Sequence, residues 1–182
     1  MTLPQELRDK GFRLDDAREA DFDAYFCISR ACYEPYVDEF FGGWVDDFQL
    51  NMNVEHFRKN FSQTAFKKIS LDGEAVGFFA FDEQPDKIEG ISVQMLGKAR
   101  NFGIGSFYLR HVTALADAGG KPIFLQVFKT NPARKLYARF GFTTYDENES
   151  HFKMRRDARG GAGKTRVARP SDNIAERVVG LL

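Results

Sequence analysis

The chain has 182 residues, a length that suits one domain whose core needs no metal or disulfide support. Its 26 lysines and arginines balance 26 aspartates and glutamates, so the chain as a whole is not a general binder of polyanions. No segment approaches about 18 consecutive apolar residues, and the first residues lack the apolar region of a signal peptide. We therefore expect neither a membrane span nor export.

The two cysteines, Cys27 and Cys32, lie five residues apart on a predicted helix. This spacing turns them about 140° away from each other, so a mutual disulfide is not expected. We expect two buried free thiols, which are typical of a reducing compartment, and therefore a cytoplasmic protein.

The first part of the chain is predicted to be mainly helical. A short strand at Gly11–Leu14 is followed by a helical stretch that Pro35 should break or kink, because proline lacks an amide hydrogen. A second helical region, Tyr36–Phe61, is interrupted at Gly42 and Gly43. The two glycines indicate a turn between two shorter helices.

The middle of the chain changes to a period of two. The segments AFKKISL and EAVGFFAF flank Asp72 and Gly73, which is a strong signal for a β-hairpin. After a second turn, Lys87–Leu96 places its apolar residues at alternate positions. We expect three consecutive antiparallel strands.

The remaining elements alternate between helix and strand. Ile104–Ala118 has the spacing of an amphipathic helix and ends at a pair of glycines, and Pro122–Phe128 is almost continuously apolar, as in a strand buried on both faces. The segment TNPARKLYARFGF predicts a short helix with Asn131 as its N-cap, and FTTYDENESHFKMRR predicts two strands. The chain therefore has an α/β pattern.

The end of the chain has a different composition. Residues 155–182 contain seven basic and three acidic residues, a net charge of +4. We place the domain at 1–154 and expect 155–182 to form a mobile basic tail, with enough apolar residues in NIAERVVGLL for a short C-terminal helix. The tail has no aromatic residue for base stacking, so nucleic acid is not an expected partner.

The segment KARNFGIGSFY places Arg100 before a glycine pair that opens a helix. A dinucleotide fingerprint would need a third glycine where Tyr108 stands. The tail segment GGAGKT would need a glycine at Ala158 to be a Walker A loop, and we interpret it as a chance match. Backbone N–H groups around Gly103 and Gly105 would instead form a positive cradle suited to a pyrophosphate.

This loop, followed by a helix, a buried strand and NPARKLYARFGF, resembles the GCN5-related N-acetyltransferases. In that family an R-x-x-G-x-G loop holds the pyrophosphate of acetyl-coenzyme A (acetyl-CoA), and a segment with the pattern L-Y-x-x-x-G-F lies under its pantetheine and thiol. The order of elements agrees from about Phe12 to Met154, although Gly97 stands where many members have a proline. The resemblance implies an α/β (α+β) fold with a mixed, mostly antiparallel sheet of about six or seven strands and about four helices.

The resemblance also implies roles for individual residues. The cofactor contacts that it assigns are Met95, Leu96, Gly97, Arg100, Asn101, Phe102, Gly103, Ile104, Gly105, Ser106, Asn131, Tyr137 and Arg139. A tyrosine at the place of Tyr137 directs its hydroxyl at the cofactor sulfur in the family, where a phenol can protonate the leaving thiolate. The alternative for Tyr137 is a purely structural role in the core. The alternative for Asn131 is that it only caps the helix.

The implied activity is transfer of an acetyl group from acetyl-CoA to an amine of a small molecule or a protein, by direct attack in a ternary complex. A base is required only for an amine that arrives protonated, and Glu89 is favoured over Asp38, Glu39 and Asp82 because the family often has a glutamate on this strand. The alternative function is a non-catalytic sensor or partner protein that binds acyl-CoA.

The acceptor pocket should lie between the N-terminal helices, with Tyr33, Tyr36 and Trp44 as candidate contacts for a cationic amine. The alternative is that these aromatic residues only cover the sheet. The three histidines show no metal-ligand spacing, so no metal is expected. A monomer and a homodimer are both compatible with the sequence.

Overall fold

The structure is a computed structural model that describes residues 1–160. Its α-helices are α1 Gln5–Asp9, α2 Phe22–Phe41, α3 Asp46–Phe61, α4 Ile104–Gly119 and α5 Ala133–Arg139. Its strands are β1 Phe12–Asp16, β2 Ala65–Leu71, β3 Glu74–Glu83, β4 Ile88–Met95, β5 Ile123–Phe128, β6 Thr143–Glu147 and β7 His151–Arg156. Two 3-10 turns, η1 Glu19–Asp21 and η2 Gly97–Ala99, complete the regular structure of the described residues.

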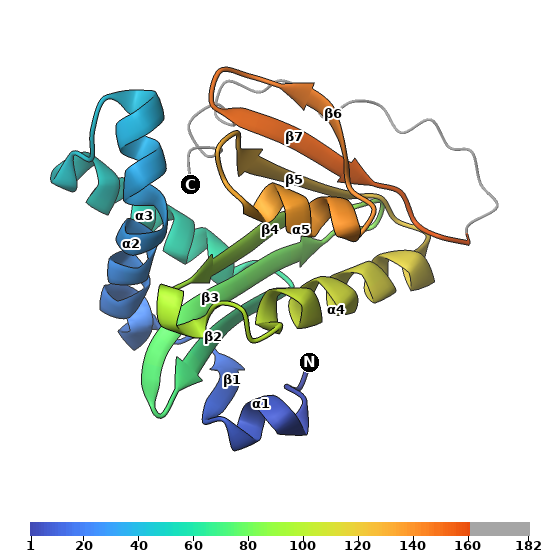
Figure 1. Ribbon diagram of the computed structural model, residues 1–182, viewed down its shortest axis with the longest axis horizontal. Coiled ribbons are helices and arrows are strands. Elements are labelled where there is room, and N and C mark those ends of the chain that lie inside the picture. Colours follow the sequence, from blue (N-terminus) through green and yellow to red (C-terminus); the bar gives the residue numbers. More distant parts are fainter. Residues whose placement is uncertain (161–182) are drawn as a thin grey trace.

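The strands form one mixed sheet in the order β1-β2-β3-β4-β5-β7-β6 (Figure 1). β4 and β5 run parallel, whereas the other neighbouring strands are antiparallel. The prediction of six or seven strands, mostly antiparallel, is confirmed. Five α-helices rather than about four accompany the sheet within residues 1–160, because α1 has no clear periodic pattern in the sequence.

The helices cover both faces of the sheet. Residues of α1, α4 and α5 pack with the larger hydrophobic core on one face, and residues of α2 and α3 pack with a second cluster on the other. Figure 1 shows α4 and α5 in front of the sheet and α2 and α3 at its left-hand end. A site between β4 and β5 is therefore reached by groups from both helical layers.

Three details differ from the expectations. α2 continues through Pro35 to Phe41, because apolar burial beyond the proline, with Val37 2% exposed, outweighs one missing backbone hydrogen bond. Cys27 and Cys32 are unpaired as expected, but Cys27 is exposed and Cys32 is only half-buried, since the apolar face of α2 is narrower than the sequence indicates.

β7 continues two residues past the boundary expected at 154. Its last residue, Arg156, is buried and forms a bidentate ion pair with Asp117 at the end of α4. The first basic residues of the expected tail thus belong to the sheet. The Walker-like segment and the expected C-terminal helix lie outside the described residues, except for Gly160 at the start of that segment.

β4 contains an irregularity that decides which side chains face α2. Asp82 of β3 pairs with Glu89, but Ala80 pairs with Ser92, so one extra residue of β4 lies opposite Phe81. Gly90 takes up this β-bulge in the left-handed region, at φ +64°. Because a one-residue slip exchanges the faces of a strand, the bulge puts Glu89 and Ser92 on the same side of the sheet.

Candidate active site

A cleft opens where β4 and β5 separate. The two strands pair at one position only, Ile88 with Ile123, and diverge from there. Beyond this point each strand is hydrogen-bonded on its other side, β4 to β3 and β5 to β7. The facing strand edges therefore offer backbone N–H and C=O groups to a ligand that enters the cleft.

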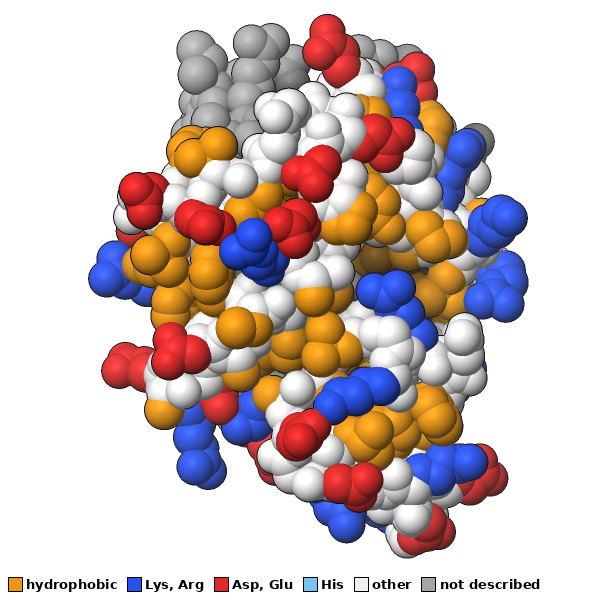
Figure 2. Space-filling view, turned by 60° about the vertical axis from the view of Figure 1, so that its left-hand side comes forward, with side chains coloured by type: hydrophobic (Ala, Val, Ile, Leu, Met, Phe, Trp, Pro, Cys, Tyr) orange, Lys and Arg blue, Asp and Glu red, His pale blue; other side chains and the backbone are white. Residues whose placement is uncertain are grey.

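The cleft is part of a cavity of about 1070 Å³, which is at the upper end of the sizes usual for small-molecule sites. Its walls come from α2, α3, β4, β5, the loop before α4, α5 and the β6–β7 hairpin. Figure 2 shows the face that carries α2 and α3, on which acidic and basic side chains are interspersed with hydrophobic ones. The size allows a large cofactor and an acceptor to lie in one cavity.

The loop before α4 forms one end of this cavity. Asn101 and Gly103 both have left-handed backbone conformations, at φ +67° and +82°, and a turn that alternates in this way directs successive N–H groups toward one point. The N–H of Phe107 makes the first hydrogen bond of α4, to Gly103. The N–H groups of the preceding residues have no acceptor within the helix and are free to bind an anion.

Gly105 and Arg100 complete the loop. A Cβ at Gly105 would lie 3.3 Å from Leu136 Cδ2, so a glycine here allows α4 and α5 to pack closely. Arg100 Nε donates to the Met95 carbonyl at 2.9 Å, which holds the guanidinium beside the end of β4. The 3-10 turn η2, which begins at Gly97, leads from β4 into this loop.

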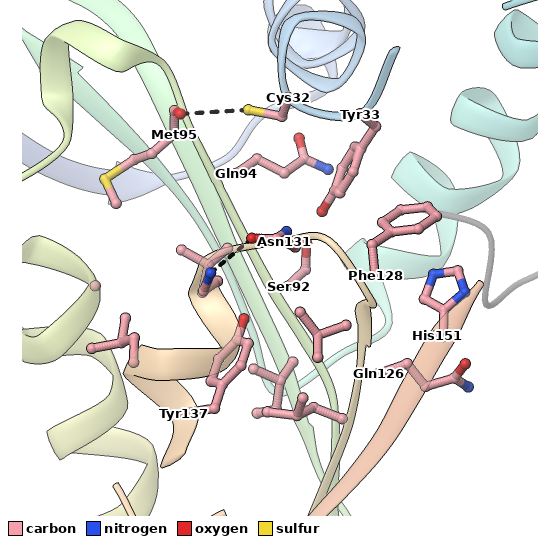
Figure 3. Close-up of a pocket in the computed structure, with 18 of the residues that line it drawn as sticks. Cys32, Tyr33, Ser92, Gln94, Met95, Gln126, Phe128, Asn131, Tyr137 and His151 are labelled. Carbon is pink, nitrogen blue, oxygen red and sulfur yellow. Dashed lines mark hydrogen bonds between the residues drawn. The ribbon is translucent and has the colours of Figure 1, made fainter. Parts of the chain in front are cut away.

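α5 presents a tyrosine to the middle of the cavity. Asn131 Oδ1 accepts a hydrogen bond from Ala133 N–H at 2.9 Å, which confirms its predicted capping role. Tyr137, 7% exposed, directs its hydroxyl into the cavity toward Asn131 and Ser92 (Figure 3). Burial raises the pKa of Tyr137 to about 12, so its hydroxyl stays protonated and can donate a proton.

A family model described as the Acetyltransferase (GNAT) family matches residues 22–142, which is more than half of the chain. The chain belongs to the GNAT acetyltransferase family. It is therefore an acyl-transfer enzyme with acetyl-CoA as co-substrate, as the sequence indicated. No curated protein is similar enough in sequence to match it.

Solved structures of low sequence identity share this GNAT fold. PaiA N-acetyltransferase from Thermoplasma acidophilum, in complex with coenzyme A, is 15% identical with a TM-score of 0.62, over 80% of this chain and 98% of that chain. YncA from Salmonella typhimurium, solved with acetyl-CoA, is 17% identical with a TM-score of 0.57, over 86% and 99%. The ribosomal-protein-S18-alanine N-acetyltransferase from Escherichia coli is 15% identical with a TM-score of 0.57, over 85% and 99%.

The cavity of this GNAT protein contains most of the residues expected at the site. Those that line it are Glu89, Met95, Arg100, Asn101, Gly103, Ile104, Gly105, Ser106, Asn131, Tyr137, Arg139, Tyr33 and Tyr36. The donor set of backbone amides, one guanidinium and diverging strand edges fits the phosphates and amides of coenzyme A. This fit depends on backbone geometry more than on side-chain identity.

Four expected site residues are not among those that line the cavity. Leu96 packs against the core cluster under α2, and Gly97 lies in η2. Phe102 is 44% exposed and packs on Phe12, away from the cavity. Trp44 lies over Arg30 at the turn between α2 and α3, because that turn points away from the cleft.

The carboxylates considered as bases separate into two pairs. Asp38 accepts the N–H of Trp44 and Glu39 accepts the hydroxyl of Thr130, and neither lines the cavity. Asp82 and Glu89 do line it, and Gln84 Nε2 bridges them at 3.1 and 2.9 Å. A further ion pair joins Glu89 to Lys87 Nζ at 2.6 Å. Gln84 and Lys87 therefore fix the Glu89 carboxylate at the cavity wall.

Several lining residues were not singled out by sequence reasoning. They are Ser92, Gln94, Gln126, Phe128 and His151. The ring of Phe128 stacks on Tyr36, with centroids 4.9 Å apart, and lies 4.0 Å from the ring of His151. Burial lowers the pKa of His151 to about 4, so its imidazole is neutral near pH 7. The polar residues at alternate positions in IEGISVQM were the available signal for Ser92 and Gln94.

Two further properties bear on the class of protein. Among residues 1–160, no group of three or more histidine, cysteine, aspartate or glutamate side chains could hold a metal ion. Over the same residues, no helix has the length and apolar character needed to cross a membrane.

Proposed function

We propose that this protein is an N-acetyltransferase that moves the acetyl group of acetyl-CoA to a primary amine of a small molecule or a protein, by direct attack in a ternary complex. The observation that carries the proposal is the buried Tyr137 hydroxyl, which enters the cavity between the anion-binding loop and the polar face of β4.

The loop and the strand edges would hold the co-substrate. The N–H groups of residues 101–106, together with Arg100, would bind the pyrophosphate, and the free edge of β4 near Met95 would pair with the pantetheine amides. Arg139, on the cavity wall, would meet the 3′-phosphate. Bound acetyl-CoA supplies an activated thioester, so this chain's residues have only to orient the reactants and move protons.

Tyr137 would act as the general acid. Its hydroxyl can protonate the thiolate that leaves when the amine displaces it. Since burial raises the pKa of Tyr137 to about 12, the acid form persists across the working range. The pH–rate profile of the wild type should therefore show no decline between about pH 7 and 10 that belongs to this residue.

Glu89 is our candidate for the group that receives a proton from an acceptor that arrives as an ammonium ion. It lies on the acceptor side of the cavity, and Lys87 and Gln84 hold it in place. An amine that arrives neutral needs no such base.

The test measures thiol release from acetyl-CoA with four amines: phenethylamine, putrescine, a blocked lysine and a peptide with a free N-terminus. Comparing the wild type with Tyr137→Phe should show a loss of about 10²-fold or more in kcat, with little change in KM for acetyl-CoA. Phe142→Leu, next to the Tyr137 ring, is the matched packing control and should retain most of the activity.

Each outcome has a distinct meaning. Binding of coenzyme A without thiol release for any amine would overturn the proposal in favour of a non-catalytic acyl-CoA-binding protein. Full activity in Tyr137→Phe would keep the transferase and remove the role of Tyr137 as acid.

A further inference from the structure

The face of β4 toward α2 carries a row of polar side chains beside the cleft. The bulge at Gly90 brings Glu89, Ser92 and Gln94 onto this face, and all three line the cavity. Without the bulge, the face would present apolar residues of β4 instead. Gly90 therefore determines that a hydroxyl group of β4 reaches the cavity.

Ser92 faces a tyrosine of α2. The hydroxyl of Tyr33 points toward the side chain of Ser92 (Figure 3), and both residues line the cavity. The Tyr33 ring also packs on Phe128, with centroids 6.3 Å apart. The two hydroxyls are thus held by a strand on one side and by a helix and an aromatic cluster on the other.

The pair lies opposite the proposed acid. In Figure 3, Tyr33 points toward Ser92 from above, and Tyr137 points toward the same region from below. A reacting centre beside Tyr137 would therefore lie next to the Ser92 hydroxyl.

We propose that Ser92 contacts the acceptor nitrogen and that Tyr33 positions Ser92 for this contact. This inference rests on the proposed transferase function and deepens it. The chemistry follows from what each hydroxyl can donate and accept. Each has one O–H and two lone pairs, so Ser92 can accept an N–H from a ligand while Tyr33 donates its O–H to Ser92. A neutral primary amine has two N–H groups and one lone pair, so donating an N–H to Ser92 would leave the lone pair directed at the thioester carbon.

A structural link between α2 and β4 is the competing explanation, and the chain contains a matched control for it. Ser29 of α2 donates to Gln94 of β4 at 3.0 Å, and the two residues are 0% and 2% exposed. This pair joins the same two elements, but Ser29 does not line the cavity. Ser29→Ala removes a link of the same kind without reaching the acceptor.

The experiment compares Ser92→Ala, Tyr33→Phe and Ser29→Ala with the wild type, for each of the four amines above that the wild type acetylates. We expect the first two to lower kcat/KM for the amine about tenfold, the effect of one oriented hydrogen bond, with KM for acetyl-CoA unchanged. The double variant of Ser92 and Tyr33 should lose little more than either single variant. Ser29→Ala should be less stable yet retain the wild-type kcat/KM.

Equal kinetic losses in all three variants, or a change confined to KM for acetyl-CoA, would overturn the inference while leaving the transferase function intact. A wild type that binds coenzyme A and acetylates none of the four amines would overturn the function, and the inference with it. Tyr33→Phe keeps the ring on Phe128, so it remains informative if Ser92→Ala folds poorly.

Discussion

The ion pair between Arg156 and Asp117 should be a principal stabilising contact at the end of the sheet. Arg156 donates to both oxygens of Asp117, at 2.9 and 2.8 Å, and its Nε donates to the Phe140 carbonyl at 3.0 Å. It thereby joins β7 to the end of α4 and to the turn after α5. The substitution Arg156→Met removes the guanidinium and keeps most of the apolar stem.

The expected magnitude follows from burial. Removing one partner of a fully buried ion pair costs about 3–5 kcal/mol. Here the Arg156 side chain is 4% exposed but that of Asp117 is 30% exposed, so water can replace some of the lost contacts to the carboxylate. We therefore expect Arg156→Met to lower the free energy of unfolding by about 2–3 kcal/mol, or Tm by about 4–12 °C.

The pH dependence of this loss provides a second readout. The hydrogen bond from Arg156 lowers the pKa of Asp117, against the opposing effect of partial burial. The pKa of Asp117 is lower in the folded state than the unfolded value of about 3.9. The ion pair therefore makes its full contribution to the free energy of unfolding above about pH 3.9, and this contribution disappears as the pH falls through the folded-state pKa. The difference between wild type and Arg156→Met should be constant near neutral pH and should shrink as the pH falls below about 4.

Urea denaturation followed by circular dichroism would measure both effects. Asp117→Asn, which keeps the shape and removes the charge, should lose a smaller amount with little pH dependence in the same range. Thiol release at 25 °C should be unchanged in Arg156→Met, because the pair lies outside the cavity. A loss below about 1 kcal/mol, the usual limit for exposed pairs, would refute this reasoning.

Four further substitutions test the site. Gly90→Ala, strained at φ +64°, should lower kcat/KM for the amine and spare KM for acetyl-CoA; an unchanged acceptor rate would contradict the role of the bulge. Gly103→Ala, at φ +82°, should raise KM for acetyl-CoA about tenfold. Gly105→Ala needs only a small movement of Leu136 and should raise this KM less. A larger rise in KM for Gly105→Ala than for Gly103→Ala would be evidence against the loop geometry. Glu89→Gln should slow the reaction mainly below the pKa of the amine, and an equal loss at high pH would exclude its role as the base.

Local chemistry explains what was predictable about the site. Short segments of sequence are enough to recognise some structural features. Examples are glycines at the start of a helix, an asparagine two residues before a helical N–H, and a tyrosine on the inner face of a short helix. Gly103 and Asn131 were located from such signals, whereas the site role of Tyr137 was implied by the resemblance to the family. The structure places all three on one cavity. The contributions of Trp44 and Phe102 could not be judged in this way, because the direction of a turn depends on what the flanking helices pack against.

By itself the sequence determined the order of elements, the loop that opens α4 and the buried strand β5, since these depend on periodicity, glycine and proline within a few residues. Only the tertiary structure decided that β4 and β5 separate, that Ser92 faces the cleft, and that Arg156 belongs to the sheet. Each of these depends on register or pairing between segments far apart in the chain. The bulge at Gly90 is the clearest case, because one extra residue changes the side of the sheet to which every later residue of β4 points.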